Sequence, residues 1–211
     1  WRSHWLRQAL AVEADLAPTL DGKIEADVCI VGGGYLGLWT AIRLREADPG
    51  LDVVVIERDI CGGGPSGRNS GMLLSAWTKL AVIETLRNES EALRIVEQTT
   101  MAIDAIERFC SENGIDCWFD RVGWIWGATC AAQDGAWNDA LSRYEQLGRE
   151  PARRVSRDEI AAMTGSSGFL AGAYDASAST VHPGFLVRGL RRVALARGVR
   201  IYEKSAMTGF S

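Results

Sequence analysis

The sequence predicts an α/β fold, because short apolar runs typical of buried parallel strands alternate with helical segments. Two such runs, 27–31 and 53–56, flank a helical segment that begins directly after a glycine-rich turn. A third strand, over 199–204, follows a strong helical pattern over 185–197. Strands joined by helices in this way are the units from which parallel sheets are built.

The glycine-rich turn after the first strand carries Gly32, Gly34 and Gly37, which match the spacing G-x-G-x-x-G. Gly32 permits a sharp turn, Gly34 lets a pyrophosphate approach the backbone, and Gly37 lets the helix lie close to the sheet. The helix start, which includes Tyr35 and Leu36, would point its free amides at the phosphates. This stretch therefore predicts a dinucleotide-binding turn.

The second strand is closed by Glu57, which follows Gly32 by 25 residues. At about this spacing a carboxylate accepts hydrogen bonds from an adenosine ribose, and its charge disfavours a 2′-phosphate and hence NADP. Arg58 comes next and is a further candidate cofactor contact. Up to this point, NAD and FAD remain equally compatible with the pattern.

A second glycine-rich run, from Cys61 to Gly71, follows the acid, and a plain NAD-binding domain has no use for it. Its residues 64–71 read G-P-S-G-R-N-S-G. This segment resembles the G-x-S-G-R-N-x-G motif of the D-amino-acid oxidase superfamily of FAD-dependent amine and amino-acid oxidoreductases. That superfamily includes the glycine, sarcosine and gamma-glutamylputrescine oxidases.

The resemblance implies FAD as the cofactor, with 66–71 running along its pyrophosphate, ribityl chain and flavin ring. The contacts implied in this segment are Ser66, Gly67, Arg68, Asn69 and Gly71. Arg68 is expected to contact the cofactor or brace the loop rather than clamp a substrate carboxylate. Cys61 stands at the loop entrance, on the adenosine side by the family pattern, so we expect no covalent flavin link there.

Beyond the second motif, longer helices replace the regular alternation. A helical pattern over 77–87 precedes a longer helix from Ser90, expected as its N-cap, to Gly114, expected just past its end. Residues 115–122 and 124–130 are predicted to form paired strands joined at Gly123. The tryptophans of the second strand share one face and are expected to pack in a core.

The remaining middle segment predicts a helix over 133–147 and a strand over 169–174. Between them, Ser156 and Glu159 have the spacing of a capping box that starts a short helix ending at Gly165. Further on, His182 precedes a proline at the start of the last helix. We expect His182 to be structural rather than a general base.

The family resemblance also implies a domain organisation. A Rossmann-type FAD-binding domain would be interrupted by an inserted α+β substrate domain, incomplete in this chain. Residues 1–75 would form the first part of the FAD-binding domain, 76–179 part of the substrate domain, and 180–211 the return to the FAD-binding domain. The resemblance covers about half of a full family enzyme, so the catalytic residues are not identified from this sequence.

Composition excludes several classes of partner. The net charge of −4 and the pI near 5.3 argue against nucleic acid, and no stretch reaches the roughly 18 apolar residues of a membrane span. The five cysteines lack metal-ligand spacing, which favours a reduced cytoplasmic protein without a metal site.

The predicted function is FAD-dependent oxidation of a small amine or amino acid, by hydride transfer to flavin N5 that leaves an imine. The missing C-terminal half or another subunit is a candidate partner. Two alternatives stay open. A NAD-dependent dehydrogenase would leave the motif at 66–71 unexplained, and a flavin-binding subunit or fragment would have no activity of its own. The substrate and the electron acceptor, oxygen or another, are not determined.

Overall fold

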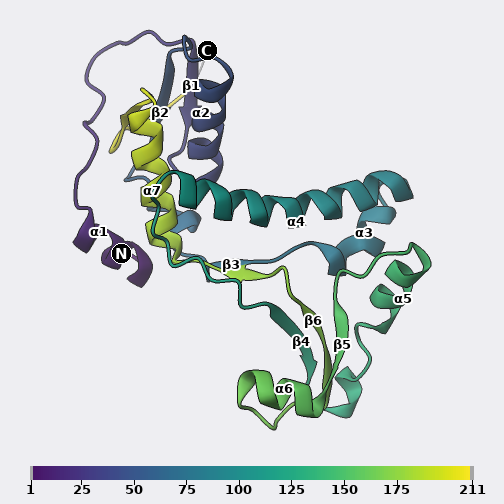
Figure 1. Cartoon of the computed structure of the whole chain (residues 1–211). Coiled ribbons are helices and arrows are strands. Elements are labelled where there is room, and N and C mark those ends of the chain that lie inside the picture. The colour runs from purple at the N-terminus through teal and green to yellow at the C-terminus, as the bar shows by residue number, and fades with distance from the viewer. Residues whose placement is uncertain (1, 210–211) are drawn as a thin grey trace. The chain divides into compact units, whose positions relative to one another are not determined.

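The computed structural model describes residues 2–209, whose contacts divide the chain into two units. The first unit comprises Trp1–Gly71, Arg108–Phe119 and Val181–Ser211, and the second comprises Met72–Glu107 and Asp120–Thr180. Figure 1 labels the α-helices and most strands of both units. Each unit is described separately below.

A three-stranded parallel sheet forms the centre of the first unit. It contains β1 (Val28–Val31), β2 (Val53–Ile56) and β8 (Arg200–Tyr202), in the order β1-β2-β8. The valines of β2 are buried, as expected for the middle strand of a parallel sheet. All three strands were expected from the apolar runs, and the predicted α/β class is confirmed.

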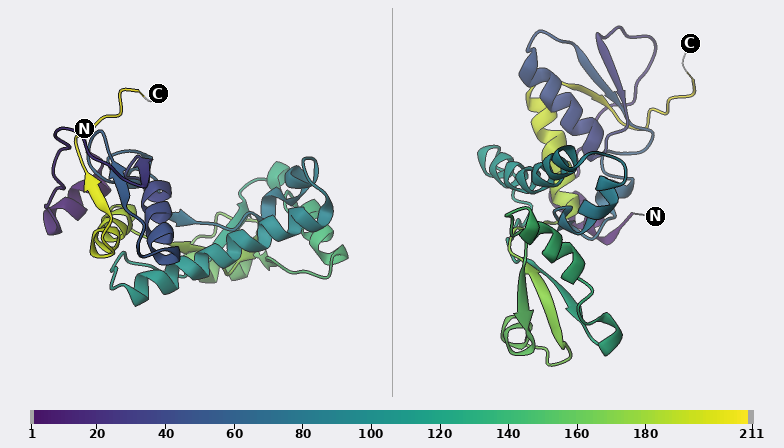
Figure 2. Two further views of the ribbon diagram at one scale, coloured as in Figure 1. Left: turned by 90° about the horizontal axis from the view of Figure 1, so that it is seen from above. Right: turned by 90° about the vertical axis from the view of Figure 1, so that its right-hand side faces the viewer.

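Three helices accompany this sheet. Helix α1 (His4–Val12) packs on α7 (Pro183–Ala196), which in turn packs against α2 (Tyr35–Ala47) (Figure 2). A short 3₁₀ turn, η1 (Pro65–Gly67), lies against α7. The side chains that close this core are fully buried: Leu6, Leu38, Ile42, Val53, Ile60 and Leu190.

The second unit contains two antiparallel sheets. The strands β3 (Met72–Leu73) and β7 (Ser179–Thr180) form a short pair. The other sheet has β6 (Ala171–Asp175) between β4 (Trp124–Ala128) and β5 (Arg153–Ser156).

The helical elements of the second unit pack against this larger sheet. The α-helices are α3 (Leu80–Glu84), α4 (Glu89–Glu112, which continues into the first unit), α5 (Asn138–Gln146) and α6 (Arg157–Thr164). The 3₁₀ turns are η2 (Trp77–Lys79) and η3 (Ala131–Gln133). Their buried core includes Trp77, Leu80, Val96, Trp137, Leu141 and Tyr144, with Trp124 and Trp126 packed against it. The predicted capping box is present at the start of α6, and Gly165 ends that helix in the left-handed conformation.

The strand predicted over 115–122 is wrong. In this segment only Asp120 forms an isolated bridge, and β4 pairs with β6 instead. The amides of Ile115 and Cys117 donate to the carbonyl oxygens of Cys110 and Ile115, which closes tight turns after α4. Trp118 then adopts a positive φ of 53°. Beyond these turns, the Cys117 carbonyl oxygen accepts the His182 amide, and Asp120 and Thr180 exchange both backbone hydrogen bonds, so the segment bonds to residues 178–182 and not to β4. The strand β5 was not expected, because its sequence R-R-V-S offers a single apolar residue.

The predicted N-cap of α4 is also wrong. The helix begins at Glu89, one residue before Ser90. The Asn88 side-chain oxygen accepts the Glu91 amide at 2.9 Å, and the Ser90 hydroxyl only donates to that same oxygen. Asparagine and serine cap helices about equally well, so the sequence alone does not separate neighbouring candidates.

We expect Asn88→Ala to lower the free energy of unfolding by about 1 kcal/mol, because the Glu91 amide loses its partner. Ser90→Ala is the matched control and should cost clearly less. Urea denaturation followed by circular dichroism measures both. A larger loss from the serine variant would contradict the assignment of Asn88 as the cap.

Candidate functional site

The two glycine-rich loops of the first unit meet each other directly. The Gly62 amide donates to the Gly33 carbonyl oxygen at 3.0 Å, and the Tyr35 amide donates to Ser66 Oγ at 2.9 Å. A Cβ added to Gly33 would lie 2.4 Å from Cys61 Sγ. The two glycine-rich motifs predicted from the sequence thus lie in direct contact, with no space for a side chain at Gly33.

Glycine is required at each position of the first loop for a different structural reason. Gly32 has a φ of 112°, which a residue with a side chain rarely adopts. A Cβ at Gly37 would lie 2.0 Å from the Gly32 carbonyl oxygen, so only glycine allows the predicted close packing of helix and strand. The sequence assigns Gly34 to pyrophosphate approach, whereas in the structure a Cβ there would come within 2.9 Å of Ser66 Oγ.

A cavity of about 520 Å³ lies between the loops, at the carboxyl ends of β1 and β2. Ligands of parallel sheets bind at this edge. Six of the predicted site residues line the cavity: Gly32, Gly34, Glu57, Arg58, Ser66 and Arg68. A neighbouring cavity of about 240 Å³ shares three of these residues, Gly32, Glu57 and Arg58.

Backbone amides at this cavity are available as donors. Within residues 2–209, the amides of Gly34, Leu36 and Gly64 donate no hydrogen bond. Gly34 and Leu36 stand at the N-terminus of α2, where the helix dipole favours an anion. Gly34 and Gly64 line the cavity itself. The arrangement is therefore chemically suited to phosphate oxygens.

Glu57 faces both cavities and is held in one orientation. Its Oε2 accepts the Gly33 amide at 2.8 Å, and its Oε1 accepts the Asp59 amide at 2.9 Å. A carboxylate has about four acceptor positions, so each oxygen keeps capacity for a ligand hydroxyl. Asp59 is paired with Arg2, and this hydrogen bond lowers the pKa of the Asp59 carboxyl.

The other predicted site residues do not line the larger cavity. Only glycine fits at position 67, since a Cβ there would lie 2.3 Å from the Gly62 carbonyl oxygen. The Asn69 side chain accepts the Gly71 amide at 2.8 Å and donates to the Ser66 carbonyl oxygen at 2.9 Å. These residues shape the second loop from within.

Tyr35, Leu36 and Gly37 begin α2 beside this loop. The Tyr35 hydroxyl donates to the Pro183 carbonyl oxygen at 3.0 Å, and burial raises the pKa of Tyr35 to about 12. Leu36 has an exposed fraction of 82%. Of the three, Leu36 alone presents its side chain openly to solvent.

The smaller cavity also contains residues that the sequence did not identify. Ser205, Ala206 and Met207 line it, just past β8. Because β8 is parallel to β2, its carboxyl end reaches the same edge of the sheet. Ligands bind at the carboxyl ends of parallel strands, and applying this rule to the strand predicted over 199–204 would have identified these three residues.

His182 is the N-cap of α7, in keeping with the structural role expected for it. Its Nδ1 accepts the Phe185 amide at 3.0 Å, and its Nε2 faces Gln8 Oε1 at 3.1 Å. The side chain is 2% exposed, and burial lowers its pKa. Since Nδ1 accepts a hydrogen bond, the proton of the neutral ring belongs on Nε2, which donates to Gln8.

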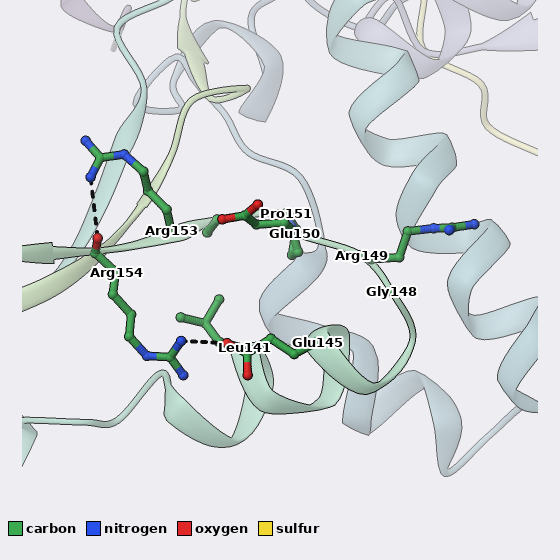
Figure 3. Close-up of a pocket in the computed structure, with 9 residues that line it drawn as sticks. Leu141, Glu145, Gly148, Arg149, Glu150, Pro151, Arg153 and Arg154 are labelled. Atoms are coloured by element: carbon green, nitrogen blue, oxygen red, sulfur yellow. Dashed lines mark hydrogen bonds and ion pairs between the residues drawn. The ribbon is translucent and has the colours of Figure 1, made fainter.

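The second unit has a polar cavity of about 380 Å³ between α5 and β5 (Figure 3). Its charged side chains are exposed, and its arginines are already paired, as Arg154 is with Glu145 at 2.6 Å and Arg153 with Glu159 at 2.8 Å. We therefore assign it no function. Among residues 2–209, no group of His, Cys, Asp or Glu side chains is arranged to hold a metal ion. No helix in that range has the length and apolar character needed to cross a membrane.

Residues 27–211 match the family model described as DAO, FAD dependent oxidoreductase. The chain belongs to this family. The match contains both glycine-rich loops and the return through α7 and β8, and it confirms the predicted family and its cofactor, FAD.

Curated relatives in the family are similar over most of this chain. Gamma-glutamylputrescine oxidoreductase of Escherichia coli is 31% identical over 191 residues, which is 90% of this chain and 44% of that protein. A probable oxidoreductase OrdL of Rhizobium meliloti is 30% identical, over 93% of this chain and 46% of that protein. The chain thus spans less than half the length of these relatives.

Solved structures of other proteins share the fold. The L-amino acid deaminase of Proteus myxofaciens matches 93% of this chain and 42% of its own, with a TM-score of 0.74 and 21% identity. Glycine oxidase of Geobacillus kaustophilus matches 85% of this chain and 46% of its own, with a TM-score of 0.64 and 22% identity.

The buried cap at His182 predicts a pH-dependent stability. Because folding lowers the pKa of His182, the unfolded chain binds its proton first, and stability falls as the pH drops below about 6.5. His182→Asn keeps a capping side chain but does not titrate, so it should flatten this part of the profile. Urea denaturation across that pH range measures it. Equal slopes for wild type and His182→Asn would contradict the assignment.

Proposed function

We propose that the cavity between the two loops holds the adenosine diphosphate part of FAD, in a protein that oxidises an amine or amino acid. The observation that carries this proposal is the junction of the loops, which places free amides, a helix N-terminus and a fixed carboxylate around one cavity. A dinucleotide requires these three features.

Each part of the site has a role in this proposal. The amides of Gly34, Leu36 and Gly64 donate to the pyrophosphate, and the helix dipole of α2 favours its charge. Glu57 accepts hydrogen bonds from the adenosine ribose, and the residues after β8 border the adenine. Arg68 donates to the Gly63 carbonyl oxygen at 2.9 Å and braces the second loop. Bound FAD supplies the redox chemistry, as the acceptor of a hydride at N5.

The substrate class follows from the relatives. Their names specify gamma-glutamylputrescine, L-amino acids and glycine as the molecules on which they act. We therefore propose a small amine or amino acid as the substrate, with an imine as the first product. The first unit serves as the FAD-binding domain, and the second is part of the substrate domain. We also keep a cytoplasmic location as part of the proposal.

A second candidate function is flavin binding without activity in this chain alone. The observation that favours it is the coverage of less than half of each relative. In that case the groups that orient the substrate come from the missing C-terminal half or from another subunit. A NAD-dependent dehydrogenase is not proposed, because the family model is that of FAD-dependent proteins.

Visible absorbance and substrate bleaching separate these candidates. We expect the purified protein to show flavin absorbance bands and to lose them without oxygen when a substrate from a panel of amines and amino acids is added. Flavin bands that no amine bleaches would favour the binding-only function. A protein that shows no flavin bands and does not take up added FAD would contradict both.

Gly64→Ala tests the placement of the pyrophosphate. A Cβ at Gly64 meets no protein atom within 4 Å, and the residue has an ordinary φ of −86°. The variant should therefore fold with unchanged stability, while a methyl group in the path of the cofactor weakens FAD binding by about tenfold or more, roughly 1.4 kcal/mol. Fluorescence titration of the flavin measures this.

Gly168→Ala in the second unit is the matched control for Gly64→Ala. Its added Cβ makes only an ordinary contact at 3.5 Å, with Ser166 Oγ, and it stands outside the proposed site. It should leave both stability and FAD affinity unchanged. An unchanged FAD dissociation constant in Gly64→Ala would contradict the placement.

A further inference from the structure

Three charged side chains of the first unit have almost no contact with solvent. Arg188 and Arg191 on α7 are each 1% exposed, and Glu203, directly after β8, is 0% exposed. Burial of an ion costs several kcal/mol unless close partners offset it, and apolar residues often fill such positions at no loss of stability. Packing alone therefore does not explain why these three positions carry charged residues.

Glu203 connects segments that are distant in the sequence. Its Oε1 accepts the Cys61 amide at 2.7 Å, and its Oε2 accepts the Ala17 amide at 2.7 Å. Arg191 Nε and Arg188 Nη1 lie 3.4 and 3.5 Å from Oε1 and offset its charge. One carboxylate thus binds both Cys61, the first residue of the second loop, and Ala17, in the segment between α1 and β1.

Asp15 binds the same two arginines from the other side. Arg191 Nη1 donates to Asp15 Oδ2 at 2.8 Å, and Arg188 Nη2 donates to the Asp15 carbonyl oxygen at 2.6 Å. The Asp15 side chain is 60% exposed and makes no hydrogen bond to the second loop within residues 2–209. Glu203 and Asp15 therefore share the two arginines, but only Glu203 bonds to the second loop.

The position of Cys61 determines the geometry of both loops. Cys61 Sγ occupies the space that a side chain at Gly33 would take, and the next amide, from Gly62, donates to Gly33. On the opposite side, a Cβ at Gly62 would lie 2.4 Å from Val187 Cγ1 on α7. Movement at Cys61 would consequently shift the amides that surround the cavity.

We propose that Glu203 is a positioning residue for the diphosphate, acting through the Cys61 amide rather than by contact with the ligand. The inference rests on the proposed function, since it assumes that the cavity binds a nucleotide diphosphate. Arg188 and Arg191 lie next to the buried carboxylate, and the carboxylate holds the two glycine-rich loops in place before the ligand binds. The loop is then preorganised, which lowers the cost of binding.

Glu203→Gln changes the fewest atoms. A glutamine amide is neutral and has one acceptor oxygen for the Cys61 and Ala17 amides. The Cys61 amide therefore either loses its acceptor or keeps a weaker bond to a neutral oxygen. We expect affinity for ADP to fall by about tenfold, the worth of about 1.4 kcal/mol. Affinity for adenosine, which has no phosphate, should change by less than about twofold.

Asp15→Asn is the matched control. It alters a partner of the same arginines without touching Cys61, so it should leave the ratio of the ADP and adenosine affinities unchanged even if stability falls. Isothermal titration calorimetry of the flavin-free protein measures all three chains with both ligands. A purely structural role of Glu203 would lower stability and both affinities together.

The outcomes separate this inference from the proposed function. If the wild type binds ADP and Glu203→Gln binds it equally well, or loses adenosine to the same extent, Glu203 does not position the diphosphate. If the wild type binds neither FAD nor ADP, the proposed function fails and the inference fails with it.

Hydrogen exchange on the wild type provides a test that does not depend on the folding of a variant. The Cys61 amide should be protected in the flavin-free protein, well beyond the amides of the exposed residues 22–25. Equal exchange rates at the two places would show that the loop is not held in advance, and would overturn the inference.

Discussion

The first unit depends on the close contact between its two glycine-rich loops. The hydrogen bond from Gly62 to Gly33 and the contact of Cys61 with the same glycine leave no room for adjustment between them. One loop follows the first strand and the other follows the second, and the parallel pairing of β1 with β2 up to Val31 and Ile56 brings the two loops together. Five of the eleven residues that line the cavity are glycines, so the backbone is accessible over much of its wall.

Much of this site could be predicted because its determinants are local. A glycine at each position of G-x-G-x-x-G has a steric cause that acts over a few residues, and the acid at the end of the second strand has a defined spacing. The resemblance of residues 64–71 then distinguished a flavin protein from other dinucleotide-binding proteins. The family comparison confirms that distinction.

The errors arose where long-range contacts decide the structure. Residues 115–122 contain apolar side chains at strand-like spacing, but they bond to residues 178–182 rather than to β4, and only an isolated bridge at Asp120 results. The strand β5 depends on pairing with β6, which its own two arginines do not suggest. Glu203 is similar, because nothing near it in the sequence indicates that its partners are Cys61 and Ala17. Tertiary contacts override local pattern in each case.

Glu57 shows how nucleotide preference and folding are linked in this chain. Its oxygens hold the amides of Gly33 and Asp59 in the first and second loops before any ligand is present. Replacing this carboxylate to admit a 2′-phosphate would also remove the acceptor of the Gly33 and Asp59 amides. Evolution toward a phosphorylated nucleotide would therefore have to rebuild the scaffold around this position at the same time, which favours retention of the original preference.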